Sequence, residues 1–98
     1  MRRVMHGDVV AAARVLLALP STRRGSTCRR MIAEADAAHR YSKRFGRSHA
    51  LWGDGSLMSA AGFHAMCREP GFSDLDYCQC FEMVLNALID WRLSRQHS

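Results

Sequence analysis

Apolar residues recur at helical spacing along this chain, and no segment alternates apolar and polar residues between hairpin turns. The clearest pattern lies in residues 26–45, where a repeat of about 100° per residue collects the apolar groups on one side of a helix. These residues are Cys28, Met31, Ile32, Ala35, Ala38, Tyr41 and Phe45. The chain is therefore predicted to be all-α.

Start and stop signals divide the chain into four predicted helices. Asp8 can N-cap the first helix, and Pro20 ends it. The second helix starts near Ser26 or Thr27, and Gly46 is well placed as its left-handed C-cap. The predicted boundaries are 8–19, 26–45, 56–68 and 73–94. A chain of 98 residues is long enough for one modest core, so we expect a compact bundle of about four helices forming a single domain over residues 1–98.

The fourth helix has the clearest start signal. Ser73 and Asp76 have the spacing of a capping box in its acidic variant, and Phe72 and Tyr77 flank it as a hydrophobic staple. The third helix starts at Ser56 or at the aspartate two residues before it. The residues expected to form most of the core are Val9, Leu16, Leu17, Ile32, Ala35, Leu57, Met58, Phe81, Leu85 and Leu88.

Charge is distributed unevenly along the chain. Residues 1–50 carry eleven Lys and Arg against three acids, and residues 51–98 carry three against six, which gives balances of +8 and −3. A one-sided field of this kind governs which partners approach and how fast, but it does not identify a partner. The pI near 9.6 makes an acidic protein surface, a nucleic acid or an anionic membrane face reasonable partners.

Five basic residues gather on one arc of the second helix and just beyond its end. They are Arg29, Arg40, Lys43, Arg44 and Arg47. One hypothesis is that this basic arc binds an acidic protein partner, another is that it contacts nucleic-acid phosphates, and a third is that it is a solvated helix face. Asp36 stands four residues before Arg40 and suits a helix-face ion pair with it.

The loop Leu51-Trp52-Gly53-Asp54-Gly55-Ser56 is the second candidate site. Two glycines around an aspartate, followed by a helix start, are compatible with a turn that cradles an anion. The dinucleotide-binding fingerprint is incomplete, because Met58 stands where its third glycine would be. The alternative is a tight turn with a helix cap, anchored by Trp52 in the core. As a partner-binding loop, it would contribute Trp52 and Asp54.

A metal site, a cofactor and a catalytic activity are not expected. His64, Cys67, Cys78 and Cys80 are possible zinc ligands, but two residues that lie two apart in a helix point about 200° away from each other. The five histidines form no spacing that binds metal or relays protons, and no known catalytic motif occurs. No apolar run is long enough to span a bilayer, and we expect a cytoplasmic protein.

Three segments resemble a family of small, uncharacterised alphaproteobacterial proteins. They are residues 6–14, residues 33–41 and, above all, residues 51–58. The resemblance implies a bacterial cytoplasmic setting and carries no activity, cofactor or partner. From the residues themselves we expect a non-catalytic adaptor or regulatory protein that binds another macromolecule through the basic arc and the Trp52 loop. A nucleic-acid-binding regulator that uses the same arginines is the alternative.

Overall fold

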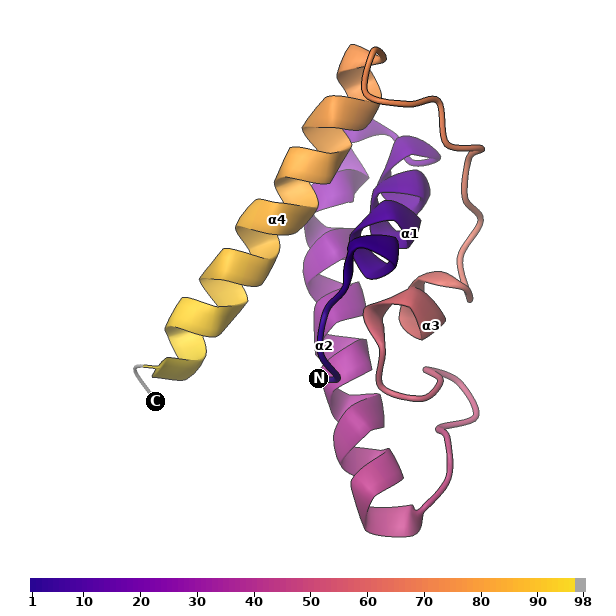
Figure 1. Ribbon diagram of the computed structural model, residues 1–98, viewed down its shortest axis with the longest axis vertical. Coiled ribbons are helices and arrows are strands. Elements are labelled where there is room, and N and C mark those ends of the chain that lie inside the picture. Colours follow the sequence, from indigo (N-terminus) through magenta and orange to yellow (C-terminus); the bar gives the residue numbers. More distant parts are fainter. Residues whose placement is uncertain (97–98) are drawn as a thin grey trace.

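The computed structural model describes residues 1–96, and within them the chain forms four helices and no sheet (Figure 1). The helices are α1 (His6–Leu17), α2 (Ser21–Phe45), α3 (Leu57–Ala61) and α4 (Leu75–Gln96). The predicted all-α bundle is therefore confirmed. In Figure 1, α1 lies between α4 on one side and α3 on the other, and the long α2 runs behind it. None of the described helices is both long and apolar enough to cross a membrane.

Helix α1 begins two residues before the predicted start, and Asp8 is not its N-cap. Asp8 occupies the third helical position, where its buried carboxylate accepts a hydrogen bond from the backbone N–H of Met5 at 2.7 Å. Its other oxygen accepts from the N–H of Met58 at 2.9 Å. One carboxylate therefore satisfies the first turns of both α1 and α3 and holds the two helices together.

Helix α2 begins at Ser21, five residues before the predicted start. Pro20 is its N-cap residue, and its carbonyl accepts from the N–H of Arg23 at 3.0 Å. The first turn is held by Arg24, which donates to the carbonyl of Leu19 and makes two bonds to Asp76 of α4, at 2.7 and 3.1 Å. At the other end, the predicted left-handed cap is confirmed, since Gly46 has a φ of 69°.

Helix α3 is much shorter than predicted, because it ends at Ala61 instead of residue 68. The chain then turns through Gly62 and runs alongside α1. The N–H of Cys67 donates to the carbonyl of Arg14 at 3.1 Å, and the Arg14 Nε donates to the carbonyl of Cys67 at 2.7 Å. These two bonds hold residue 67 against the backbone of α1 instead of in a continuation of α3.

Helix α4 is capped differently from the prediction. The carboxylate of Asp74 accepts from the N–H of Tyr77 at 2.9 Å, whereas Asp76 is exposed and pairs with Arg24. The predicted capping box between Ser73 and Asp76 is thus wrong. The predicted contact between Phe72 and Tyr77 is present, with their rings 5.4 Å apart, although the shift of the cap to Asp74 takes these residues out of the staple positions.

The core lies where α1 meets α2, α3 and α4. Among the predicted core residues, Val9, Leu16, Ile32, Ala35 and Leu57 are buried. Leu17, Phe81 and Leu88 are half-buried. The prediction is wrong for Met58 and Leu85, which are 49% and 43% exposed. The fully buried residues of α4 are Tyr77, Cys80 and Val84. Beside them, Phe81, Met83, Ala87, Leu88 and Trp91 pack against the core while partly buried.

Candidate functional site

The carboxyl-terminal end of α2 and the loop that follows form one continuous structure. After the Gly46 cap, His49 and Gly53 exchange two backbone hydrogen bonds, of 2.8 and 3.0 Å, which close a tight turn. Inside the turn, His49 Nδ1 accepts from the N–H groups of Leu51 and Trp52, at 3.0 and 3.2 Å. The imidazole therefore fixes the loop and presents Leu51 to solvent, where it is 67% exposed.

Four rings stack between this loop and the last turns of α2. The rings of His49 and Trp52 lie nearly parallel with centroids 4.6 Å apart, and the ring of Tyr41 meets His49 edge-on at 4.9 Å. Phe45 packs on Tyr41 at 4.6 Å yet remains 53% exposed. Phe45 thus lies beside Tyr41 on the apolar side of the helix, as predicted, but beyond the core, where it is exposed. Trp52 is half-buried in this stack and does not belong to the core cluster.

Basic residues lie next to these rings in the sequence, and one of them contacts the ring stack. Lys43, Arg44 and Arg47 are all exposed, and the Arg44 guanidinium lies 5.4 Å from the centre of the Phe45 ring. Arg40 lies one turn earlier and is also exposed. We call the exposed and half-buried side chains of this region the α2-end surface; they are Lys43, Arg44, Phe45, Arg47, Leu51 and Trp52. The structure thus places Arg44 of the predicted basic arc against the ring stack that includes Trp52, and Lys43 and Arg47 lie close to Arg44 in the sequence.

Arg29 is not part of this surface. It precedes Arg40 by eleven residues, which corresponds to roughly 16 Å along the helix axis. Arg29 instead lines a groove of about 380 Å³ between α2 and α4, whose lining also includes Ile32, Ala87 and Trp91. The predicted basic arc is therefore divided between two places on the molecule.

The carboxylate of Asp54 is engaged within the protein. One oxygen accepts from the N–H of Ser56 at 2.9 Å, and the other accepts from the Arg2 guanidinium at 2.9 Å. The hydrogen bonds from Ser56 lower the pKa of Asp54 below its ordinary value, and the charge of Arg2 adds to this effect. This arrangement favours the interpretation of the loop as a turn with a helix cap.

The start of α3 also favours that interpretation. The Ser56 side chain accepts from the N–H of Ser59 at 3.1 Å, and Asp8 accepts from the N–H of Met58. Protein groups thus occupy positions where a bound anion would accept hydrogen bonds. Gly55, with a φ of 99°, packs so closely that a Cβ there would lie 2.6 Å from the Cα of His39. Its glycine is explained by this contact with α2.

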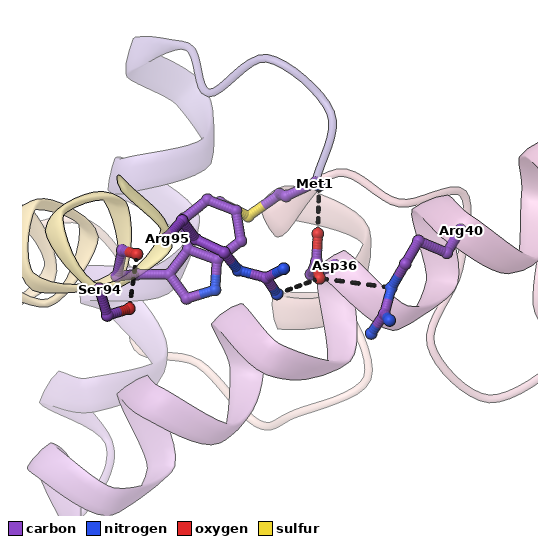
Figure 2. Close-up of polar contacts among 6 residues, drawn as sticks. Met1, Asp36, Arg40, Ser94 and Arg95 are labelled. Atoms are coloured by element: carbon purple, nitrogen blue, oxygen red, sulfur yellow. Dashed lines mark hydrogen bonds and ion pairs between the residues drawn. The ribbon is translucent and has the colours of Figure 1, made fainter. Parts of the chain in front are cut away.

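A buried carboxylate binds three cationic groups on the side of α2 near the end of α4 (Figure 2). Asp36 accepts from the α-amino group of Met1 at 2.5 Å and from Arg95 at 2.6 Å, and the predicted pair with Arg40 is confirmed at 3.4 Å. Burial raises the pKa of Asp36, but the hydrogen bond and charge of the Met1 amine and the two arginines outweigh burial and leave this pKa below its ordinary value.

Sequence reasoning missed most of this cluster. Arg95 lies 59 residues from Asp36 and Met1 lies 35 residues away, so only the local pair with Arg40 has a sequence signal. The cluster leaves an excess of positive charge near the middle of α2. Burial lowers the pKa of His39, and the nearby Met1 amine, Lys43 and Arg2 lower it further.

The cysteines do not belong to the α2-end surface. Cys28 and Cys80 are buried, and burial raises the pKa of Cys28 to about 11. Cys78 donates its thiol hydrogen to the carbonyl of Phe72 at 3.0 Å. Within residues 1–96, no group of three or more His, Cys, Asp or Glu side chains is arranged to hold a metal ion.

These features define a small all-α protein with a basic and aromatic surface at one end of its longest helix. The chain belongs to the DUF7742 family, a domain of unknown function, whose match covers residues 2–88. The match includes α1, α2 and α3 and continues through Leu88 of α4. No curated protein and no solved structure matches the chain.

Proposed function

We propose that this protein is a non-catalytic interaction protein that binds an acidic surface of a partner protein through the α2-end surface. The observation that carries the proposal is the exposure of Phe45 and Leu51, at 53% and 67%, among three basic side chains. Among the described residues, no ion pair involves Lys43, Arg44 or Arg47. Their charges are therefore available to a partner.

This composition matches the anatomy of a protein interface. Aromatic and large apolar side chains supply most of the binding energy once they are desolvated, and surrounding charges steer association and fix register. The His49 stack holds the Trp52 ring in place, so little conformational entropy is lost when a partner covers it. We place this activity in the bacterial cytoplasm, in line with the resemblance to small alphaproteobacterial proteins.

Five of the nine acidic side chains are engaged within the protein, which favours a structural role for them over a catalytic one. Asp8, Asp54 and Asp74 accept hydrogen bonds from backbone N–H groups at the starts of helices or turns. Asp36 and Asp76 form ion pairs with arginines. These carboxylates hold the fold together, and general acid or base work would require a side chain free to exchange a proton with a substrate.

A nucleic-acid-binding regulator is the second candidate, because cations beside a stacked aromatic pair also suit bases and phosphates. Arg44 and Arg47 would contact phosphates, and the ring of Trp52 would stack on a base. Under this alternative, affinity for nucleic acid falls steeply with salt, since each neutralised phosphate releases nearly one counterion.

The test is capture from native extract, with and without nuclease, by the wild-type chain and two double variants. Lys43→Glu with Arg44→Glu reverses the charge of the α2-end surface. Arg29→Glu with Arg30→Glu makes the same change in net charge near the other end of α2. We expect a protein that is retained after nuclease by wild type and by the second variant, and lost with the first.

Two results would overturn the proposal. Capture that disappears with nuclease would favour the regulator, as would duplex binding at micromolar or tighter affinity in about 150 mM salt that the first double variant abolishes. Equal retention of the partner by both double variants would place the binding surface elsewhere. Arg40 is left unchanged because it pairs with Asp36, so its reversal would also perturb the fold.

A further inference from the structure

The outer side of α4 carries an apolar stripe that the fold leaves uncovered. Leu85, Ile89 and Leu93 are 43%, 55% and 48% exposed. At about 100° per residue, these three residues lie roughly 150° around α4 from its buried residues Tyr77, Cys80 and Val84. Figure 1 shows that α4 is the outermost helix on its side of the bundle and that its carboxyl-terminal half diverges from α2.

The charges beside this stripe are arranged symmetrically about position 87. Leu85 and Ile89 lie two residues before and after that position, and Glu82 and Arg92 lie five residues before and after it. Glu82, Leu85, Ile89 and Arg92 follow the alternating spacing of three and four residues that forms a helix–helix seam. Both charged side chains are exposed.

A second copy of the chain fits this pattern in one orientation only. In an antiparallel pair with its two-fold axis at position 87, Leu85 packs against Ile89 of the other copy, and Glu82 meets Arg92 of the other copy. The axis repeats both contacts, so two apolar layers are flanked by two ion pairs. A parallel pair would place Glu82 against Glu82 and Arg92 against Arg92, and this repulsion selects against it.

We propose that two copies of this protein associate through α4 in this antiparallel register. The interface is independent of the α2-end surface, and each copy would present its own. Ile89 and Arg92 lie beyond the residues that match the family, so this property concerns the present chain.

Sedimentation equilibrium of the full chain, with charge-reversed variants, tests the register. We expect a wild-type dimer with a dissociation constant on the order of 10 µM, typical of a small interface. Glu82→Arg alone, or Arg92→Glu alone, should raise that constant by at least about tenfold, because each change creates two like-charge contacts. The double variant carrying both changes should return to within about threefold of wild type, because the swap restores both pairs.

A matched control is Asp90→Arg, which makes the same change in charge as Glu82→Arg at an exposed position about 100° around α4 from Ile89, at the groove between α2 and α4. It should leave the dissociation constant within about threefold of wild type. A thermal melt of each variant by circular dichroism verifies the fold. A wild-type monomer up to about 500 µM would overturn the proposal, as would a dimer that single reversals leave unchanged or that the double swap fails to restore.

Discussion

Replacing Asp36 by asparagine should strongly destabilise the protein, because Asp36 is a buried carboxylate with three cationic partners. The Asp36 side chain is only 7% exposed and accepts from the Met1 amine, Arg95 and Arg40 (Figure 2). Breaking a buried ion pair costs about 3–5 kcal/mol, because it leaves a charge without its counter-charge. That cost must be reduced here, since Arg95 and Arg40 are 51% and 69% exposed and each contributes under about 1 kcal/mol.

We therefore expect Asp36→Asn to lower the free energy of unfolding by about 2–3 kcal/mol at neutral pH. For a domain of this size, that loss corresponds to a decrease in Tm of roughly 10–20 °C. The assay is urea unfolding followed by far-UV circular dichroism, with the midpoint and slope fitted separately. Asp90→Asn removes an exposed acid from α4 and should change the stability by less than about 0.5 kcal/mol.

The same variant predicts a pH dependence with a definite sign. The pKa of Asp36 is lower in the folded state than its ordinary value of 3.8. Its contribution to stability is therefore fully present above pH 3.8 and is lost as pH falls through the folded pKa. The difference between wild type and Asp36→Asn should shrink as the pH is lowered through this window. A loss below about 0.5 kcal/mol at neutral pH, or a difference that grows on acidification, would refute the reasoning.

Three further predictions concern packing, backbone geometry and thiol reactivity. Leu16→Ala should cost about 2–5 kcal/mol in urea unfolding. Leu85→Ala should cost less than about 1 kcal/mol at a protein concentration well below the dissociation constant of the proposed dimer, because its side chain is 43% exposed in the single chain. Similar losses for the two variants would contradict the described core. Gly55→Ala should cost at least about 2 kcal/mol, since the added Cβ would collide with the backbone of α2. Gly46 also has a left-handed φ but open space around it, so Gly46→Ala should cost only about 1 kcal/mol. Cys28, whose pKa is raised to about 11, should react with iodoacetamide at pH 8 at the slow rate of global unfolding, and rapid labelling of the native protein would show that it is accessible.

The elements that local patterns determine were predictable, whereas those that distant contacts determine were not. Residues 26–45 repeat their apolar groups at helical spacing, and that helix ends at Gly46 as predicted. Residues 21–25 contain no large apolar side chain, so periodicity gave no sign that α2 starts at Ser21. The contact that fixes this turn joins Arg24 to Asp76, 52 residues away in sequence.

The third helix shows the opposite error for the same reason. Residues 62–68 have helical spacing of apolar groups, yet the chain there bonds to the backbone of α1 through Cys67 and Arg14. A pairing between residues 53 apart has no sequence signal. The exposure of Leu85 follows likewise from how α4 crosses the bundle, because a helix with apolar residues around much of its circumference does not reveal which stripe becomes buried.

The candidate site was partly predictable. The basic residues near the end of α2 and Trp52 could be identified from the sequence, but their grouping depends on the turn between His49 and Gly53. That turn stacks the Trp52 ring on His49. Arg29 lies apart from this group because it is eleven residues before Arg40 on α2. The engagement of Asp54 by Arg2 required the path of the amino terminus, which no local pattern gives.

The claim that the α2-end surface binds an acidic partner protein is tested most directly by the dissociation constant of the captured partner, measured across salt concentrations. The proteins compared are the wild-type chain, Trp52→Ala and the double variant Lys43→Glu with Arg44→Glu. A thermal melt of each variant shows that the fold is retained. We predict that Trp52→Ala raises the dissociation constant by at least about tenfold through faster dissociation, and that the double reversal acts mainly by slowing association. An unchanged constant for Trp52→Ala, together with affinity that vanishes at moderate salt, would contradict the account.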